Sequence, residues 1–259
     1  MLFGRPRLLL PKLASMKKSE MEKNDRLIIS GDGAFYSLQG EGVNMGLPAV
    51  FLRLHLCNLK CVWCDTWYTW NRKTDEFRNE SKKWTIEETV RKIKQTWKCQ
   101  NKLVKKRLVI TGGEPLLQQD GLVKVLKKLP EWNVEIETNG TIKPEKELTS
   151  RCQFNCSPKT NNSLNRKSAR VKPKVINALK SVDTFFKFVV VEAKDIEEIE
   201  RDYIKPFMLD PNRVIIMPQG VTKEEVRINA LKMVDFVKSR GYRILLRLHL
   251  DLWGAERGV

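Results

Sequence analysis

Short apolar and β-branched runs recur along the chain and predict a series of strands. The first clear run, 49–56 (AVFLRLHL), is apolar except for Arg53 and His55. Runs of about four to eight such residues are typical of buried strands. The other runs that we expect to form strands lie at 108–111, 134–137, 154–157, 184–191, 213–217 and 243–248.

Between these runs, apolar residues recur at the spacing of amphipathic helices. In the segment 85–99, Thr85 and Glu88 have the spacing of a capping box, and the apolar residues that follow fall on one helical face. Pro173 suits the first turn of a later helix. The other predicted helices lie at 122–129, 173–179, 195–203 and 223–238.

The alternation of strands and helices predicts an α/β fold with a mostly parallel sheet and helices outside it. Most gaps between strands are long enough for a crossover helix, which disfavours hairpins. Ligands of such sheets bind at the carboxyl ends of the strands. The polar stretch 66–84 is predicted to be a long loop near that edge. No linker divides the chain, so one domain over 27–259 is the simplest interpretation.

Composition narrows the class of protein. Apolar residues make up 41% and charged residues 31% of the chain, which is typical of a soluble globular protein rather than a disordered or membrane protein. The longest apolar run, within 184–191, is far shorter than the roughly 20 residues that span a bilayer. A net charge of +17 favours anionic partners, but Lys and Arg are scattered along the chain, which disfavours nucleic acid as the ligand.

The first 26 residues differ from the rest of the chain. Residues 1–18 are basic and contain no acid, and Pro6 and Pro11 interrupt the short apolar run. The segment therefore lacks the apolar core and cleavage site of a secretory signal peptide. We expect a cytoplasmic protein with reduced thiols and a disordered basic extension at 1–26. An organellar transit peptide, and a translation start at Met16 or Met21, are the open alternatives.

Three of the six cysteines, Cys57, Cys61 and Cys64, directly follow the predicted strand 49–56. Clustered cysteines in a reducing compartment indicate metal chemistry rather than disulfides. A structural zinc site would need a fourth ligand, and His55 is the local candidate. However, the alternation of side chains along the strand makes it difficult for His55 and Cys57 to point at the same metal ion. Three thiolates instead suit an iron–sulfur cluster with one iron left open for a substrate or cofactor.

A glycine-rich segment follows the predicted strand 108–111. Its sequence, TGGEP (111–115), places two glycines at a strand exit. They allow backbone groups to approach a ligand closely, or simply form a tight turn into the next helix. Because both this segment and the cysteines follow strands, a parallel sheet would bring them to the same edge.

The spacing Cys-x3-Cys-x2-Cys, with an aromatic residue before the last cysteine, resembles the radical S-adenosylmethionine (SAM) superfamily, and TGGEP strengthens the resemblance. Further segments are similar to the 7-carboxy-7-deazaguanine synthases of that superfamily, from about residue 27 to the C-terminus. One departure is Gly33-Ala34, where an acidic residue is expected. The segments that carry the resemblance are FYSLQGEG (35–42), CDT (64–66), TGGEP (111–115), ETNG (137–140), SPK (157–159), MPQG (217–220, loosely) and WGAERGV (253–259).

The resemblance implies a partial (β/α) barrel of the radical SAM type, and a homodimer. The three cysteines would hold a 4Fe–4S cluster whose open iron binds SAM, and an electron from the cluster would cleave SAM to methionine and a 5′-deoxyadenosyl radical. Members of the family are lyases that convert 6-carboxy-5,6,7,8-tetrahydropterin to 7-carboxy-7-deazaguanine and ammonia. This reaction is a step in the biosynthesis of queuosine-type 7-deazapurines. Mg²⁺ and an electron donor such as flavodoxin or ferredoxin are implied as well.

The resemblance also assigns residues to the substrate. We expect Leu38, Gln39 and Gly40 to offer backbone and amide groups to the heterocycle, and Thr111 to hydrogen-bond it. Arg53 suits the substrate carboxylate, because a guanidinium binds an anion through two parallel hydrogen bonds. The simpler alternatives are a turn before the strand, a helix cap at Thr111 and a solvated arginine.

For SAM, the resemblance implies contacts from the cysteine loop and from the next strand exits. The implied SAM-binding residues are Trp63, Cys64, Asp65, Gly113, Glu114, Glu137, Ser157, Pro158 and Lys159. Thr66 would give one oxygen to Mg²⁺, with substrate and water completing the octahedral shell. Cys99, Cys152 and Cys156 receive no function. His249, placed in the last predicted strand, is interpreted as structural rather than as a base.

Three other functions stay open at this point. Another radical SAM enzyme, such as a glycyl-radical activase, would share the cysteine spacing. The net charge of +17 also allows a zinc-stabilised nucleic-acid-binding protein. A catalytically idle homologue that serves as an interaction protein is the third. Iron and sulfide content, SAM cleavage and turnover of the pterin distinguish them.

Overall fold

The computed structural model describes residues 25–259. The extension predicted for 1–26 therefore lies outside the described residues, except for Asp25 and Arg26, and Arg26 already begins the first strand. Among the residues described, no helix combines the length and the apolar character needed to cross a membrane.

One nine-stranded sheet forms the centre of the fold, in the order β3-β1-β2-β4-β5-β6-β7-β8-β9. Neighbouring strands from β2 to β9 are parallel, whereas β1 pairs antiparallel with both β2 and β3. The strands are β1 (Arg26–Leu38), β2 (Pro48–Leu54), β3 (Ser81–Thr85), β4 (Arg107–Gly112), β5 (Asn133–Thr138), β6 (Cys152–Cys156), β7 (Thr184–Val190), β8 (Val214–Pro218) and β9 (Arg243–Ile244).

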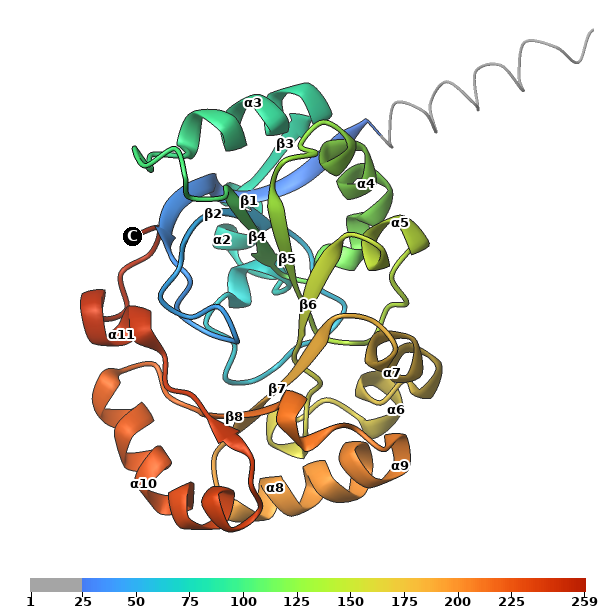
Figure 1. The fold of residues 1–259 in the computed structure, drawn as a ribbon, viewed down its shortest axis with the longest axis vertical. Helices are drawn as coiled ribbons and strands as arrows, with labels where there is room; N and C mark the ends of the chain where they lie inside the picture. The colour runs from blue at the N-terminus through green and yellow to red at the C-terminus, as the bar shows by residue number, and fades with distance from the viewer. Residues whose placement is uncertain (1–24) are drawn as a thin grey trace, which may run out of the picture.

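The sheet curves, and helices surround its outer face (Figure 1). The two edge strands, β3 and β9, do not pair with each other, so the barrel is open. The predicted partial (β/α) barrel is confirmed. The α-helices are α2 (Asp75–Asn79), α3 (Ile86–Thr96), α4 (Gln119–Lys127), α5 (Lys146–Thr149), α6 (Lys167–Arg170), α7 (Pro173–Lys180), α8 (Ala193–Ile199), α9 (Lys205–Phe207), α10 (Lys223–Ser239) and α11 (Leu248–Trp253).

Strand alternation divides the apolar residues between the two faces of the sheet. On the helix side, residues such as Ile110, Ile136 and Phe188 are fully buried in the main core. On the concave side, Val109 and Phe51 belong to a second, small cluster with Ala49 and Phe35. This cluster forms an apolar floor beneath the carboxyl ends of the first strands.

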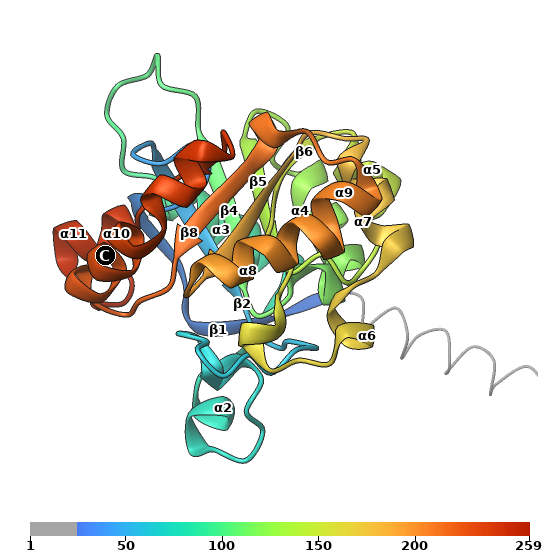
Figure 2. The same ribbon diagram turned by 90° about the horizontal axis from the view of Figure 1, so that it is seen from below.

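Two strands that the apolar pattern did not predict lie at the start of the sheet. β1 includes the first four residues of FYSLQGEG, which we expected to precede the first strand. A register shift between Ile29 and Ala34, with left-handed glycines at 31 and 33, interrupts its alternation. β3 lies in the predicted loop 66–84 except for its last residue, Thr85. Only Trp84 among its residues is buried, so this exposed edge strand left no apolar signal. Figure 2 shows α2, from the same segment, projecting from one end of the molecule.

The last predicted strand, 243–248, is mostly wrong. Only Arg243–Ile244 pairs, with β8 as its single neighbour. The chain then turns inward, where Leu248 N–H donates to the carbonyl of Gly40 over 3.0 Å, and α11 begins. His249 therefore lies on a helix and not on a strand.

Candidate active site

A cavity of about 590 Å³ opens at the carboxyl ends of the strands. Residues from the exits of β1, β2, β4, β5, β6 and β8 line it, together with α11 and the C-terminal residues. All of the predicted site residues line this cavity except Glu114 and Pro158. The fold thus brings together segments that are separated by more than a hundred residues in the sequence.

The three cysteines of the loop after β2 share this cavity, and none forms a disulfide. Burial raises the pKa of the Cys57 thiol to about 12 and raises that of Cys61 as well. As thiolates the three would also repel one another, since each of these shifts includes an unfavourable interaction with Cys64. A bound metal centre would favour the thiolate forms, as metal ligation does.

Hydrogen-bond donors surround the sulfur atoms. The Asn165 side-chain amide donates to Cys61 Sγ over 3.3 Å, and that of Asn139 approaches Cys57 Sγ at 3.9 Å. Within residues 25–259, no three Cys, His, Asp or Glu side chains converge as ligands of one metal ion. In an iron–sulfur cluster each thiolate binds a different iron, and amide donors to sulfur are typical of such sites.

His55, the candidate fourth ligand of a zinc site, is fully buried and does not line the cavity. Its Nδ1 lies 3.3 Å from Ser30 Oγ, and its ring packs on Phe77. Cys152 and Cys156 lie in the main core.

The glycines of TGGEP bring the exits of β2 and β4 into direct contact. Gly113 N–H donates to Leu54 O over 3.0 Å, and Glu114 N–H donates to Leu56 O over 2.8 Å. A Cβ on Gly113 would lie 2.0 Å from Leu56 O, so only glycine fits. Leu56 itself has a left-handed φ of 79°. This contact fixes the backbone that leads into Cys57.

Glu114 is fully buried beneath the cavity rather than on its wall. Its carboxylate accepts hydrogen bonds from Leu116 N–H (3.0 Å), Thr138 O–H (2.8 Å) and Asn139 N–H (2.7 Å). Burial raises its pKa. The side chain therefore ties the exit of β4 to that of β5, and it also caps the short helical turn that follows, the role considered for Thr111.

The predicted substrate residues meet over the apolar floor. Arg53 is half-buried, its guanidinium lies 5.4 Å from the centre of the Phe35 ring, and it forms no ion pair among the described residues. Thr111 O–H donates to Glu137 Oε2 over 2.6 Å. Gln39 is almost fully buried and donates to Glu135 over 3.2 Å. An unpaired guanidinium on the cavity wall is available to an anionic ligand.

The predicted SAM-binding segments also touch one another. Lys159 Nζ donates to Ser157 Oγ over 2.8 Å and lies 5.3 Å from the centre of the Trp63 ring. The residues after β6 therefore form one wall with the cysteine loop. Thr66 Oγ1 lies 3.5 Å from Cys64 Sγ on the same side.

The sequence did not indicate a chain of charges at the cavity, which is largely buried except at Asp65. Lys187 pairs with Glu41, and Arg247 pairs with Glu41 at 2.9 Å and with Asp65 at 2.5 Å. Burial alone would raise the pKa of Glu41, but Lys187 and Arg247 together hold it well below its ordinary value. Glu41 lies within the QGEG motif, which was the only local signal for it.

The C-terminal part of the chain closes one side of the cavity. His249 packs so tightly on Gly40 that a Cβ there would lie 2.2 Å from His249 Nδ1, and burial lowers the pKa of His249. Residues 254–259 line the cavity, and the Arg257 guanidinium lies 4.3 Å from the centre of the Tyr68 ring. His249 therefore belongs to the cavity wall, a position that its assignment to a strand had hidden.

Known proteins match this chain over most of its length. It is 36% identical to the 7-carboxy-7-deazaguanine synthase of Pyrobaculum aerophilum over 228 residues, which cover 86% of this chain and 94% of the relative. It is 30% identical to that of Halobacterium salinarum over 239 residues, covering 85% and 88%. The enzyme of Aquifex aeolicus is 29% identical over 239 residues, covering 90% and 97%.

The fold has a counterpart among solved structures. The crystal structure of QueE from Escherichia coli superposes with a TM-score of 0.63 at 22% identity, covering 86% of this chain and 95% of that one. Residues 53–149, which include the cysteines and TGGEP, match the Radical SAM superfamily model. The chain therefore belongs to the 7-carboxy-7-deazaguanine synthase family of the radical SAM superfamily.

Proposed function

We propose that this protein is a radical SAM lyase that converts 6-carboxy-5,6,7,8-tetrahydropterin to 7-carboxy-7-deazaguanine with loss of ammonia. One observation carries the proposal: the three cysteines, the TGGEP exit and the unpaired Arg53 line the same cavity. Cluster ligands, a SAM-binding segment and an anion-binding group are thus within reach of one another. Membership of the family supplies the reaction that this arrangement serves.

Cys57, Cys61 and Cys64 would hold the 4Fe–4S cluster, with SAM beside it. When bound, the cluster and SAM together supply a carbon radical that abstracts a hydrogen atom from the substrate. We assign SAM contacts to the backbone of Trp63, Cys64 and Asp65 and to residues at the carboxyl ends of the next strands. The further residues assigned to SAM are Gly113, Glu137, Ser157 and Lys159, with Glu114 and Pro158 acting from behind the wall.

The chain's own residues would orient the substrate. Arg53 would bind the substrate carboxylate through paired N–H donors, since it forms no ion pair among residues 25–259. The Thr111–Glu137 pair and the Leu38–Gly40 segment would hold the heterocycle edge. Phe35 and Phe51, whose rings stack at 5.0 Å, form a floor that excludes water from the reacting carbon.

We further propose that Thr66 gives one oxygen to Mg²⁺, whose other ligands would be substrate and water oxygens. The protein would work as a homodimer and would receive electrons from flavodoxin or ferredoxin. Each of these three statements extends the family assignment and needs its own test, by magnesium titration, sedimentation and reduction kinetics.

Anaerobic reconstitution followed by product analysis tests the main proposal. Wild-type protein supplied with iron and sulfide should bind a cluster and, with SAM, a reductant and the pterin, should form 7-carboxy-7-deazaguanine. Cys61→Ala should bind less iron and form no product, because one cluster ligand is lost. The matched control Cys99→Ala, outside the cavity, should retain both properties.

The alternatives give different results in the same experiment. SAM cleavage without turnover of the pterin would favour a radical SAM enzyme with another substrate. One zinc per chain in place of iron and sulfide would contradict the enzyme. A cluster that binds SAM poorly and releases no 5′-deoxyadenosine would indicate an idle homologue.

A further inference from the structure

Two apolar side chains project into solvent beside the cysteine loop. Val62 is 61% exposed and Leu164 is 71% exposed. They lie side by side, because Val62 N–H donates to Ser163 O over 3.3 Å. Leu164 also has a left-handed φ of 58°, an uncommon conformation for a leucine. No core contact explains why these two positions are apolar.

This surface lies directly above a predicted cluster ligand. Lys60 N–H donates to Asn165 Oδ1 over 3.0 Å, and the Asn165 amide donates to Cys61 Sγ over 3.3 Å. Cys61 and Val62 are adjacent in the chain, as are Leu164 and Asn165. An electron that enters at the two exposed side chains therefore reaches a sulfur ligand through one residue.

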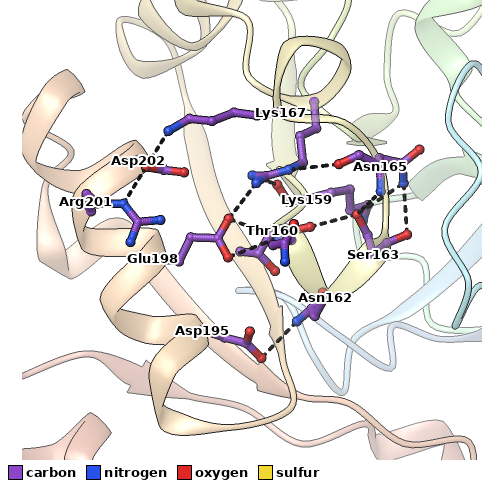
Figure 3. A network of polar contacts seen from close by, with 12 residues as sticks. Lys159, Thr160, Asn162, Ser163, Asn165, Lys167, Asp195, Glu198, Arg201 and Asp202 are labelled. Atoms are coloured by element: carbon purple, nitrogen blue, oxygen red, sulfur yellow. Dashed lines mark hydrogen bonds and ion pairs between the residues drawn. The ribbon is translucent and has the colours of Figure 1, made fainter.

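The segment that presents Leu164 is held rigidly from behind (Figure 3). Buried Arg170 donates to Lys159 O over 2.9 Å and to Glu198 over 2.6 Å. Asn162 donates to Asp195 over 3.0 Å, and it accepts from the Trp63 indole N–H over 3.1 Å. The exposed surface is thus pre-organised, which lowers the entropic cost of binding a partner.

Unpaired positive charge borders the apolar pair. Lys60 and Arg166 are exposed, and neither forms an ion pair among the described residues. Neither 57–64 nor 159–170 contains an acidic residue. We call the surface of Lys60, Val62, Leu164 and Arg166 the Val62–Leu164 rim. An apolar centre with a cationic border is complementary to an acidic protein surface.

We infer that the Val62–Leu164 rim is the docking surface for an acidic one-electron carrier protein. The reduced carrier would give one electron to the cluster through Cys61, so that the carrier is oxidised and the cluster reduced by one electron each. A small contact suits this partner, because electron-transfer complexes are brief and bury little area. The inference rests on the proposed function, which requires a reductant.

A second surface of similar composition provides the matched control. Lys102 and Lys105 flank Leu103, which is 92% exposed, and Val104, which is 37% exposed. This loop precedes β4, so it lies at the end of the parallel strands opposite to the cavity. In Figure 2 it projects, in green, at the end of the molecule opposite to α6. Composition is similar in the two surfaces, and only the position relative to Cys61 differs.

Reduction kinetics of the reconstituted protein test the inference. The probe is reduced flavodoxin with a net negative charge, and the readout is the second-order rate constant for appearance of the EPR signal of the reduced cluster. Photoreduced 5-deazariboflavin, a small neutral reductant, measures whether the cluster itself is intact. Lys60→Glu/Arg166→Glu should slow reduction by flavodoxin at least about tenfold, because attraction becomes repulsion.

The other variants separate charge from the apolar contact. Val62→Ser/Leu164→Ser should slow flavodoxin reduction by about threefold or more, in the range of one lost interface contact. Lys102→Glu/Lys105→Glu, with the same change in net charge, should leave the rate within about twofold of wild type. Reduction by 5-deazariboflavin should be equal in all variants. Wild-type reduction by flavodoxin should also slow as salt is raised, and the rim charge variant should lose that dependence.

Four outcomes would overturn the inference. Equal flavodoxin rates in the rim and control variants would show that the carrier docks elsewhere. Equal slowing with 5-deazariboflavin would show that the substitutions damage the cluster. Loss of the dimer in Val62→Ser/Leu164→Ser, seen by sedimentation with an unchanged reduction rate, would assign the rim to a second copy of the chain. Wild-type protein without a reducible cluster would overturn the proposed function together with this inference.

Discussion

Glu114 shows how one side chain supports the site without lining the cavity. Its carboxylate is fully buried and accepts three hydrogen bonds from the exit of β5 and from the turn after TGGEP. The resemblance assigns this residue to SAM. Its buried position instead favours a structural role, in which Glu114 positions the backbone and Gly113 contacts the ligand.

The role of Glu114 can be tested by separating stability from SAM binding. Glu114→Leu should lower the free energy of unfolding by about 3 kcal/mol, because buried donors lose their acceptor. Glu114→Gln keeps an acceptor oxygen and the shape, so it should cost less than half as much. Urea denaturation measures both, and calorimetric titration measures SAM affinity. A stable Glu114→Leu protein that has lost only SAM affinity would contradict the positioning role.

At the scale of elements, the exits of β2 and β4 form one unit. The backbone of the TGGEP segment packs against Leu54–Leu56 so closely that no Cβ fits at Gly113. The strands themselves follow from local apolar patterns, but this contact joins residues about sixty positions apart. It decides where the cysteine loop begins.

Gly113→Ala should therefore damage the cysteine loop as well as stability. The new Cβ would overlap Leu56 O at 2.0 Å, so the strand exits must separate and Cys57 must move. We expect a loss of about 3 kcal/mol in stability, together with iron binding reduced to less than half. Thermal unfolding and iron analysis after reconstitution measure the two effects.

Gly241→Ala is the control for this substitution. Unlike Gly113, Gly241 has a positive φ, of 71°, and nothing lies within 4 Å of an added Cβ, so alanine there strains the backbone without a steric overlap. It should cost about 1 kcal/mol and leave iron binding unchanged. Equal iron binding in the Gly113 and Gly241 variants would show that the close approach does not position the cysteines.

At the scale of the whole molecule, Arg247 joins three distant parts of the chain. It pairs with Glu41 after β1 and Asp65 in the cysteine loop, and it donates to Gly220 O after β8 over 2.8 Å. Lys187 on β7 completes the network through Glu41. The network closes the open barrel across the cavity, where no strand pairing connects β1 to β8.

This network should make stability depend on pH in the acid range. Because its charged partners hold the pKa of Glu41 below the ordinary value of 4.5, the ionised form favours folding. The contribution is present above about pH 4.5 and is lost as pH falls towards the depressed value. Glu41→Gln should lack this part of the acid dependence, which denaturation at pH 3 to 7 measures.

A double-mutant cycle tests the pairing itself. Lys187→Met should cost about 3 kcal/mol at pH 7, since it leaves part of a buried charge uncompensated. Adding Lys187→Met to Glu41→Gln should cost clearly less than adding it to wild type. Strict additivity of the two substitutions would contradict the coupling.

Local patterns in the sequence determined most of the elements and part of the site. Thr85 does cap α3, with its side chain accepting from Glu88 N–H over 3.1 Å, as the capping-box spacing predicts. The cysteine and TGGEP segments do lie on one cavity, because the exits of parallel strands share one edge. The first feature depends on contacts within one helical turn, and the second depends on strands that alternate with helices. A sequence displays both patterns directly.

Only the tertiary structure decided which distant residues meet. Glu41 and Arg247 are 206 positions apart, and neither belongs to a periodic pattern that predicts the other. The edge strand β3 and the inward turn to α11 carry little apolar signal, since their neighbours rather than their own residues hold them in place. Exposed Val62 and Leu164 look ordinary in the sequence. The proximity of Val62 to Leu164, and of Leu164 to Cys61, depends on the path of the whole chain, because about a hundred residues separate the two segments and no local pattern relates them.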